Sequence, residues 1–426
     1  MQEFDCDLHF HGYFAGGVSK NMLINTIAEQ AQLKGLHVVG SADIFHKTWF
    51  EEQILPNLIE ESNGVFSHKQ FETKFILQNE VCCNDNVHYI LFFPDYNSVT
   101  ACKTKLQKFS PIMDKFGGGR PRINLTAKEV AQIVLDEGAM IGPSHAFTPY
   151  FGIYGKFDSF DQVFGEFKKQ IFFMELGLSA DSNMSDFIED HKNYAYLSNS
   201  DSHSPWPYRI GREFNRIKMK EPNFKNLKKA LTEREEKTIT LNVGLNPKEG
   251  KYHCTACNAC YERYSIQDAI KLKWKCAKCT GRIKKGVKDR IKELSNTESS
   301  FKHSFRPEYV HMLPLAELIA DALKQKNVTS DKVQEVWKKF VEHFGTENKA
   351  LIDSTIEELA EVHAPTAERV NAFRNGFVFY LPGGGGNYGK PVICLSEKEF
   401  KQKSSEHLKE INCESDALKQ KTLGEF

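Results

Sequence analysis

The chain has 426 residues, about three times the length of a typical domain, so it is long enough for several domains. Hydrophobic residues make up 40% and charged residues 26% of it, a composition too apolar for a disordered protein. Fifty-six Lys and Arg residues balance 56 Asp and Glu residues. This balance excludes a uniformly basic nucleic-acid coat, although it allows a local basic patch.

The chain carries no signal for a membrane or for export. No stretch approaches 18 consecutive apolar residues, and the acidic start lacks a cationic segment followed by an apolar one. The 11 cysteines are odd in number, which favours a reducing compartment in which metal holds some of the thiols. We therefore expect a cytoplasmic protein that does not contact membranes.

Residues 1–205 alternate short apolar runs with helical patterns such as those over 20–34 and 127–135. The runs expected to form strands are residues 6–10, 36–40, 75–77, 88–93, 139–142, 171–174 and 196–197. Strands that are apolar almost throughout and alternate with helices predict a parallel sheet, either doubly wound or closed into a barrel. A charged helix is expected over 224–236.

Asp, Glu and His residues recur where these strands end. The first strand ends in Asp7-Leu8-His9-Phe10-His11, which places two imidazoles on one face of an extended chain, within reach of one metal ion. Further positions of this kind are Asp43, His46, Glu80, His145, Glu175, Asp201 and His203, and His88 opens the fourth run. Because loops at one edge of an α/β sheet converge on one pocket, we expect a metal site there. Imidazole and carboxylate ligands suit Zn²⁺, Mn²⁺ or Fe, and Mg²⁺ where carboxylates dominate.

The chain resembles the polymerase-and-histidinol-phosphatase (PHP) family in four places: Asp7-Leu8-His9-Phe10-His11, Glu80, His145 and Asp201-Ser202-His203. The resemblance covers roughly half of the chain. It implies a distorted seven-stranded (β/α) barrel that holds up to three metal ions for phosphoester hydrolysis. Longer phrases at 34–40, 119–121, 144–152 and 198–205, with a cysteine module and a glycine loop, are similar to the endonuclease Q family, whose members nick DNA on the 5′ side of deaminated bases.

The resemblance also implies a set of site residues. His9, His11, Glu80, Asp201 and His203 are the expected catalytic residues. The first four of these would hold one metal ion, and Glu80 would bridge to a second ion held by His88 and His145. Asp43 and His203 would be ligands of a third ion, while Glu175 and His46 would orient the imidazoles. Lys20, Arg120, Arg209 and Arg212 are candidates for phosphate contacts, the alternative being ordinary surface ion pairs.

Five cysteines cluster in the second half of the chain. Cys254, Cys257 and Cys260 are spaced by three residues, and Cys276 and Cys279 follow. Two Cys-x-x-Cys pairs at this distance predict a structural zinc site closed by four thiolates. One upstream cysteine is spare: the site takes Cys257 and Cys260, or alternatively Cys254 and Cys257, with the downstream pair.

The cysteine module is basic. Between residues 251 and 306, 14 Lys and Arg residues outnumber 5 Asp and Glu residues. Lys284 and Lys285 are therefore candidates for contacts with DNA phosphates, which would make binding sensitive to salt. The alternative is a solvated charged face on a module that packs between domains.

The carboxyl half is mainly helical, with helices expected over 315–326, 330–344, 355–362 and 366–375 and a strand over 377–381. The glycine run 383–386 lacks the Lys-Ser/Thr of a phosphate-binding loop, so we expect no nucleotide cofactor. Such a run either lets the backbone approach another backbone or a DNA phosphate, or is a plain turn.

Four segments follow from these patterns: a PHP-type phosphoesterase domain (1–245), a four-cysteine zinc module (246–300), a helical domain with the glycine loop (301–395) and a polar mobile tail (396–426). The resemblance implies a metal-dependent DNA endonuclease that cuts 5′ to uracil, hypoxanthine, xanthine or an abasic site. Zn²⁺ is expected in the cysteine site and the barrel, with Mg²⁺ or Mn²⁺ as alternatives for cleavage. Damaged DNA is the expected partner, and a sliding clamp is a candidate. The alternatives are a phosphatase of small esters and a non-catalytic DNA scaffold.

Overall fold

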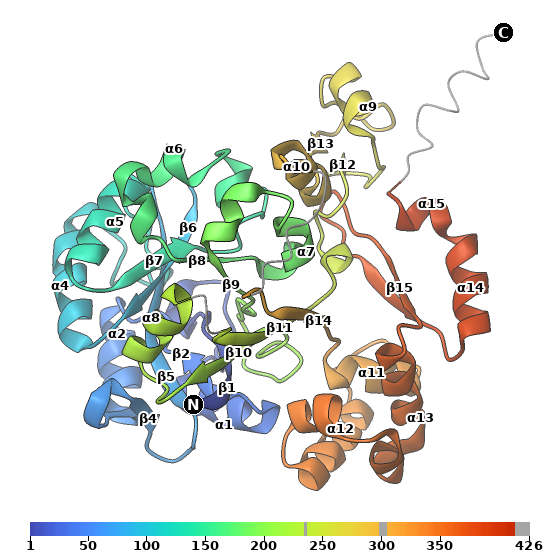
Figure 1. Cartoon of the computed structure of the whole chain (residues 1–426), viewed down its shortest axis with the longest axis horizontal. Helices are drawn as coiled ribbons and strands as arrows, with labels where there is room; N and C mark the ends of the chain where they lie inside the picture. The colour runs from blue at the N-terminus through green and yellow to red at the C-terminus, as the bar shows by residue number, and fades with distance from the viewer. Residues whose placement is uncertain (234–236, 298–304, 414–426) are drawn as a thin grey trace.

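The computed structural model describes residues 1–233, 237–297 and 305–413. A barrel with surrounding helices forms the amino-terminal half, and the cysteine module and the helical domain lie along the same side of it (Figure 1). Within the described ranges, no helix combines the length and the apolarity needed to cross a membrane. The last residues of the charged helix expected over 224–236 fall outside these ranges.

Seven strands form the barrel. They are β1 (Gln2–Asp7), β2 (Val38–Gly40), β5 (Lys74–Cys82), β6 (His88–Phe93), β7 (Met140–Pro143), β8 (Phe173–Glu175) and β9 (Ala195–Leu197). β1, β2 and β5 pair in parallel, β6 is antiparallel to both β5 and β7, and β8 pairs in parallel with β9. β8 contacts β7, and a backbone bridge between Phe10 and Ser202 returns from β9 to β1. The ring of strands is thereby closed, as the PHP resemblance implies.

The direction of β6 corrects the expectation of a wholly parallel sheet. Residues 83–87 join β5 to β6, and so short a connection allows a hairpin but not the crossover that parallel strands need. The consequence concerns His88, the first residue of β6. Because β6 runs backwards, its beginning lies at the same barrel edge as the carboxyl ends of its neighbours.

Additional strands and helices surround the ring. β10 (Phe214–Met219), β11 (Ile239–Gly244) and β14 (Glu308–His311) extend the sheet beyond β1, while β4 (Phe66–His68) and β3 (Leu58–Glu60) extend it beyond β5. The helices of this half are α1 (Ile24–Lys34), α2 (Lys47–Trp49), α3 (Leu55–Asn57), α4 (Tyr96–Leu106), α5 (Ala127–Asp136), α6 (Phe160–Phe164), α7 (Ser182–Ser185) and α8 (Phe224–Thr232). A capping box at Thr126 and Glu129 fixes the start of α5.

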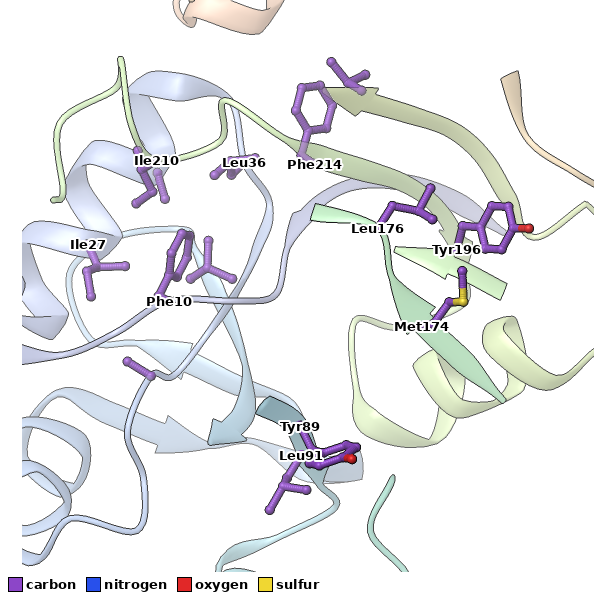
Figure 2. Packing of buried hydrophobic residues seen from close by; sticks show 14 of the residues in the cluster. Phe10, Ile27, Leu36, Tyr89, Leu91, Met174, Leu176, Tyr196, Ile210 and Phe214 are labelled. Carbon is purple, nitrogen blue, oxygen red and sulfur yellow. The ribbon is translucent and has the colours of Figure 1, made fainter. Parts of the chain in front are cut away.

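The core contains side chains from the barrel strands and from the helices around them, including α1 and α5. Figure 2 shows Ile27 of α1, Tyr89 and Leu91 of β6, Met174 of β8 and Tyr196 of β9 within it. All five are fully buried, and each buried side chain of this size stabilises the fold by about 1.5–3 kcal/mol. This packing holds the strand ends, and therefore the loops that follow them, in fixed positions.

The cysteine module contains β12 (Ala256–Cys257), α9 (Ile266–Lys271), β13 (Ile283–Lys284) and α10 (Val287–Leu294). The helical domain contains α11 (Leu315–Ala322), α12 (Asp331–Phe344) and α13 (Ile356–Arg374), followed by the hairpin of β15 (Val378–Leu381) and β16 (Lys390–Ile393). The two helices expected over 355–362 and 366–375 are both present within α13, because the backbone leaves the helical conformation at His363 (φ −160°, ψ 96°), two residues before Pro365.

A buried ion pair fastens the helical domain to the barrel. Lys34 Nζ, at the end of α1, lies 2.6 Å from Glu347 Oε1, and both side chains are fully buried. Glu347 also accepts hydrogen bonds from the backbone N–H of Leu315 and from the Trp337 indole N–H. Buried charges are tolerated only when they are paired in this way, so the position of the helical domain against α1 is fixed.

The glycine run 383–386 lies against the cysteine module. Gly384 pairs its backbone with Cys254, and a Cβ on Gly385 (φ +66°) would lie 2.1 Å from the Cys257 carbonyl oxygen. The glycines therefore allow a close approach to the backbone of the cysteine module. Beyond the hairpin, part of the expected polar tail is helical: α14 (Glu397–Glu406) and α15 (Leu408–Ile411) pack on β15.

Candidate metal centre and cysteine site

Glu80 lies at the centre of the site, between four imidazoles. Its Oε1 lies 3.5 Å from His9 Nε2 and 3.3 Å from both His88 Nδ1 and His145 Nε2. Its Oε2 lies 3.3 Å from His11 Nε2. The side chains come from the loop after β1, from β5, from the start of β6 and from the loop after β7, so the closed barrel is what brings them together.

Three overlapping groups of side chains offer ligand atoms close enough to share a metal ion. Each group keeps its ligand atoms within 4.8 Å of one another. The groups are His9, His11 and Glu80; Glu80, His88 and His145; and His11, Asp201 and His203. Seven of the eight predicted ligands thus converge, although they span almost 200 residues of sequence. The resemblance implies up to three ions, and which of these groups holds an ion stays a prediction.

The chemistry of the unpaired atoms fits cations. His9 Nε2, His11 Nε2, Glu80 Oε1 and Asp201 Oδ1 are buried and have no hydrogen-bond partner in the described part of the chain. Polar atoms buried without partners are costly, and those of native proteins call for an explanation such as a bound ion. His and carboxylate ligands are those that Zn²⁺ and Mn²⁺ take, so the donor set fits such ions.

The electrostatics lead to the same conclusion. Burial alone would lower the pKa of His9, but the carboxylates of Glu175, Glu80 and Asp201 raise it to about 9. Conversely, burial would raise the pKa of Asp201, whereas His9 and His11 hold it below its usual range. The negative field at His9 and His11 is strong enough to bind protons at neutral pH, whereas burial lowers the pKa of His88. Divalent cations compete for the same field and would displace those protons.

Two carboxylates contact the Nδ1 atoms of His9 and His11, on the side of each ring that faces away from the centre of the site. Glu175, at the end of β8, contacts His9 Nδ1 at 2.9 and 3.1 Å and also accepts the backbone N–H of His145. Asp43 Oδ1 lies 3.1 Å from His11 Nδ1. Each contact leaves Nε2 directed at the centre of the site. Glu175 therefore has the orienting role expected for it, and Asp43 has such a role too; a direct bond from Asp43 to a metal stays a prediction.

His46 does not orient the ligands as expected. Its Nδ1 accepts the backbone N–H of Trp49, its Nε2 contacts the Lys115 carbonyl, and its ring stacks on Phe14. His46 therefore helps to hold a neighbouring loop.

Backbone strain occurs at two ligands. His145 and Asp201 have φ of +30° and +46°, in the left-handed region that side chains other than glycine seldom adopt. Buried hydrogen bonds hold the second of these loops: the Asp7 carboxylate accepts the backbone N–H groups of Ser200 and Gly211. No role was predicted for Asp7, although it stands at the end of the first strand, two residues before His9, where a functional side chain is expected.

The predicted phosphate contacts have different surroundings. Arg120 Nη1 lies 3.5 Å from Glu80 Oε2, at the edge of the site. Arg212 donates to the Ser200 carbonyl, and its Nε is buried without a partner among the described residues. Arg209 lies over the Tyr208 ring, and exposed Lys20 follows Ser19, whose backbone N–H donates to the His203 carbonyl. All four come from loops near the candidate ligands.

The cysteine site uses the preferred set of four thiols. Cys257 Sγ lies 3.5 Å from Cys279 Sγ, Cys260 Sγ lies 3.6 Å from Cys276 Sγ, and all four sulfur atoms lie within 4.8 Å of one another. These separations suit a tetrahedral Zn²⁺ with bonds of about 2.3 Å. Burial opposes ionisation of Cys276, but the Tyr264 hydroxyl and nearby backbone N–H groups lower its pKa to about 6, which favours the thiolate that a metal binds.

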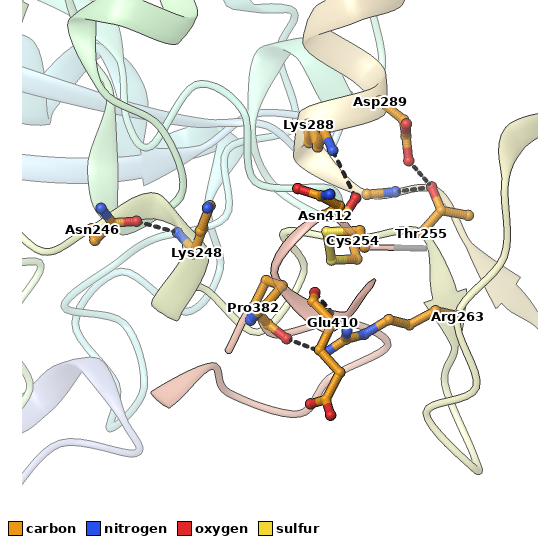
Figure 3. The surroundings of a disulfide bond; sticks show 12 residues. Asn246, Lys248, Cys254, Thr255, Arg263, Lys288, Asp289, Pro382, Glu410 and Asn412 are labelled. Atoms are coloured by element: carbon orange, nitrogen blue, oxygen red, sulfur yellow. Dashed lines mark hydrogen bonds between the residues drawn. A yellow bond between two sulfur atoms is a disulfide. The ribbon is translucent and has the colours of Figure 1, made fainter. Parts of the chain in front are cut away.

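Cys254 is not a member of this set, which excludes the alternative zinc pair in this structure. It forms a disulfide with Cys413, 159 residues further along the chain (Figure 3). The expectation that the cysteines are either free or metal-bound was therefore wrong for these two. The bond joins the module to the chain just after α15. Two hydrogen bonds support the same contact: Arg263 donates to the Glu410 carbonyl and Lys288 to that of Asn412.

The comparisons with known proteins cover both halves of the chain. A family model described as the MJ0043 C-terminal domain matches residues 314–377, which form most of the helical domain. An uncharacterized protein of Bacillus subtilis, YqxK, is 31% identical over 92% of this chain and 99% of its own length. MJ0043 of Methanocaldococcus jannaschii, also uncharacterized, is 42% identical over 63% of this chain but only 33% of its own length.

Two solved structures resemble the whole chain. The lesion-specific endonuclease PfuEndoQ of Pyrococcus furiosus is 43% identical, with a TM-score of 0.86 over 96% of this chain and 98% of that one. A complex of endonuclease Q with a 27-mer duplex, which carries an abasic lesion at the active site, has the same identity and TM-score over 94% of this chain and 98% of that one.

The closed barrel and its cluster of imidazoles and carboxylates agree with the fold that the PHP resemblance implies, and a cysteine module and a helical domain are joined to them. The agreement with PfuEndoQ extends over nearly the full length of both chains. The chain belongs to the endonuclease Q family.

Replacing Glu175 with Gln should weaken metal binding at the barrel by about 10- to 100-fold, because His9 loses the carboxylate that fixes its ring. Isothermal titration of the metal-stripped variant with Mn²⁺ measures this loss. Glu166→Gln removes a carboxylate from an exposed surface pair with Lys128 and should bind Mn²⁺ like the wild type. Equal affinities for the Glu175 variant and the wild type would show that Glu175 does not position a ligand.

The zinc content of variants distinguishes the four cysteines of the zinc site from the two cysteines of the disulfide. We expect Cys276→Ser to lose one equivalent of tightly held zinc per chain, because three thiolates do not close the site. Cys254→Ser and Cys413→Ser should keep it, since neither residue belongs to the four-thiol cluster. Elemental analysis of the purified variants measures the zinc. A loss in Cys254→Ser with retention in Cys276→Ser would reverse the assignment.

Proposed function

We propose that this protein is a metal-dependent, lesion-specific DNA endonuclease. The observation that carries the proposal is the convergence of seven candidate ligands, Glu80 among them, with four buried ligand atoms unpaired among the described residues. Likeness to endonuclease Q over nearly the whole chain gives the substrate class. The strand is cut 5′ to uracil, hypoxanthine, xanthine or an abasic site, which leaves a 3′-hydroxyl.

His9, His11, Glu80 and Asp201 would hold one ion, Glu80, His88 and His145 would hold a second, and Asp43 and His203 would serve a third; all but Asp43 belong to the groups of close ligand atoms. Divalent cations in such a site lower the pKa of water and neutralise phosphate oxygens, which promotes hydrolysis of a phosphodiester. Zn²⁺ suits the imidazoles, with Mg²⁺ or Mn²⁺ as the alternatives for cleavage.

The chain's own residues bind and orient the substrate. Arg120, beside Glu80, and Arg212, with its unpaired Nε, bind the phosphates next to the cut. Glu175 and Asp43 keep Nδ1 of the first two imidazoles occupied, so that Nε2 faces the site. The damaged nucleotide leaves the base stack, which costs least where pairing is already weakened. A sliding clamp remains a candidate protein partner.

Asp201→Asn should abolish cleavage while the protein stays folded. Asn has nearly the same shape and tolerates the left-handed backbone at this position, but it removes the negative charge. We expect the rate to fall by more than about 100-fold, since loss of an outer partner alone costs about 10- to 100-fold. The assay uses end-labelled duplexes with one uracil, hypoxanthine, xanthine or abasic site, with Mg²⁺ or Mn²⁺.

The undamaged duplex is the control substrate, and Asp136→Asn, at the exposed end of α5, is a control for the same exchange of a carboxylate for an amide. A nick confined to the damaged strand of the lesion duplexes supports the proposal. Hydrolysis of small phosphoesters alone would replace it with a phosphatase, and binding without cutting would replace it with a scaffold. Full activity of Asp201→Asn would overturn the site assignment.

A further inference from the structure

Between the barrel and the cysteine module, three tyrosine rings and two lysine ammonium groups lie next to one another in a row. Lys284 Nζ of the module lies 4.2 Å from the ring centroid of Tyr150, whose ring meets Tyr252 at 5.3 Å. Lys251 Nζ lies 5.4 Å from Tyr252 and 5.7 Å from Tyr388, which follows the glycine run. We call these five residues the tyrosine–lysine strip.

The strip begins next to the candidate metal centre. Phe151, which follows Tyr150, stacks on the His88 ring at 4.4 Å and accepts that residue's backbone N–H. A strand held at the metal centre would therefore reach the Tyr150 end of the strip.

Fastening the module to the barrel does not account for the strip. Arg290 of α10 serves that purpose through hydrogen bonds to the carbonyls of Tyr154 and Phe157. By contrast, Tyr388 is 63% exposed and Tyr150 is 40% exposed. Neither Lys251 nor Lys284 forms an ion pair with any described acidic residue. The rings and charges of the strip thus remain available to a ligand.

This chemistry fits unpaired DNA. Aromatic side chains stack on bases of any sequence once the bases are free of the duplex, and lysines between them neutralise phosphates. Bases inside a duplex are already stacked on one another and cannot use such rings. An apolar peptide would leave both ammonium groups unpaired, and a chain of phosphates alone would make no use of the rings.

We propose that the tyrosine–lysine strip binds an unpaired stretch of DNA beside the cut site, with bases stacked on Tyr388 and Tyr150 and phosphates on Lys251 and Lys284. The inference rests on the proposed function, since extrusion of a damaged nucleotide creates the unpaired stretch. It adds a binding surface for the substrate that lies outside the metal centre and reaches the cysteine module.

Binding measurements on undamaged DNA test the strip without cleavage. Fluorescence anisotropy gives the affinity of the full-length protein for a labelled single-stranded oligonucleotide, and competition gives its affinity for inorganic polyphosphate. Tyr388→Leu should bind the oligonucleotide about tenfold more weakly and polyphosphate unchanged, because it loses a stacking ring but no charge. Tyr388→Phe keeps the ring and should bind both as the wild type does.

The double variant Lys251→Gln/Lys284→Gln should weaken both ligands and lower the salt slope of oligonucleotide binding by about 1.4. Tyr261→Leu and Lys225→Gln change an exposed ring and an exposed lysine outside the strip and should change neither affinity. Zinc content and thermal unfolding establish that each variant is folded.

The proposal is overturned if folded Tyr388→Leu binds the oligonucleotide like the wild type, or if it loses affinity for polyphosphate to the same extent. It is also overturned if Tyr388→Phe behaves like Tyr388→Leu. Failure of the proposed function has a different signature: the wild type then nicks none of the lesion duplexes, whatever the variants bind.

Discussion

The carboxylate of Glu80 constrains the rest of the amino-terminal half. It is fully buried, it lies within 3.5 Å of four imidazoles, and one of its oxygens has no hydrogen-bond partner among the described residues. An arrangement of this kind is expensive in a protein interior unless cations occupy it. The closed ring of strands holds the four imidazoles at one edge, and the contacts of Glu175 and Asp43 fix two of the rings. The helical domain and the cysteine module then determine which phosphoester can bind at this edge.

Two features turn a barrel with metal ligands into a site for a long polymer. The helical domain is held by the buried pair of Lys34 and Glu347, so its position against the barrel is defined. The cysteine module is held between the barrel, through Arg290, and the carboxyl-terminal segment, through the disulfide of Cys254. A small substrate needs neither addition, whereas a DNA strand extends well beyond the metal centre and gains from surfaces on both sides of it.

Much of this site was predictable because it depends on local rules. The pair His9 and His11, two residues apart after an apolar run, and the phrase that contains Asp201 both indicate strand-end ligands without any structure. The direction of β6 was not foreseen, although the five residues before His88 are too few for a crossover. The short connection before His88 indicates an antiparallel hairpin. It also explains why this candidate ligand lies at the beginning of a strand and not at the end of one.

Other features depend on distant pairing that no local pattern encodes. Cys254 looked like a spare zinc ligand because its partner, Cys413, lies 159 residues away in a polar segment. His46 occupies a strand-end position like the candidate ligands, yet its ring turns toward Phe14 and Lys115. Direction of a side chain at a given position depends on tertiary packing. For the same reason the tyrosine–lysine strip, assembled from four separate segments, could not be recognised in the sequence.

We infer that the buried atoms around Glu80 bind cations. Anomalous diffraction from crystals grown with saturating Mn²⁺ tests this inference. We expect anomalous density within bonding distance of Glu80 and of imidazoles from at least two of the loops that meet there. A well-ordered Glu80 surrounded by the same imidazoles, with no anomalous density between them at saturating Mn²⁺, would contradict it.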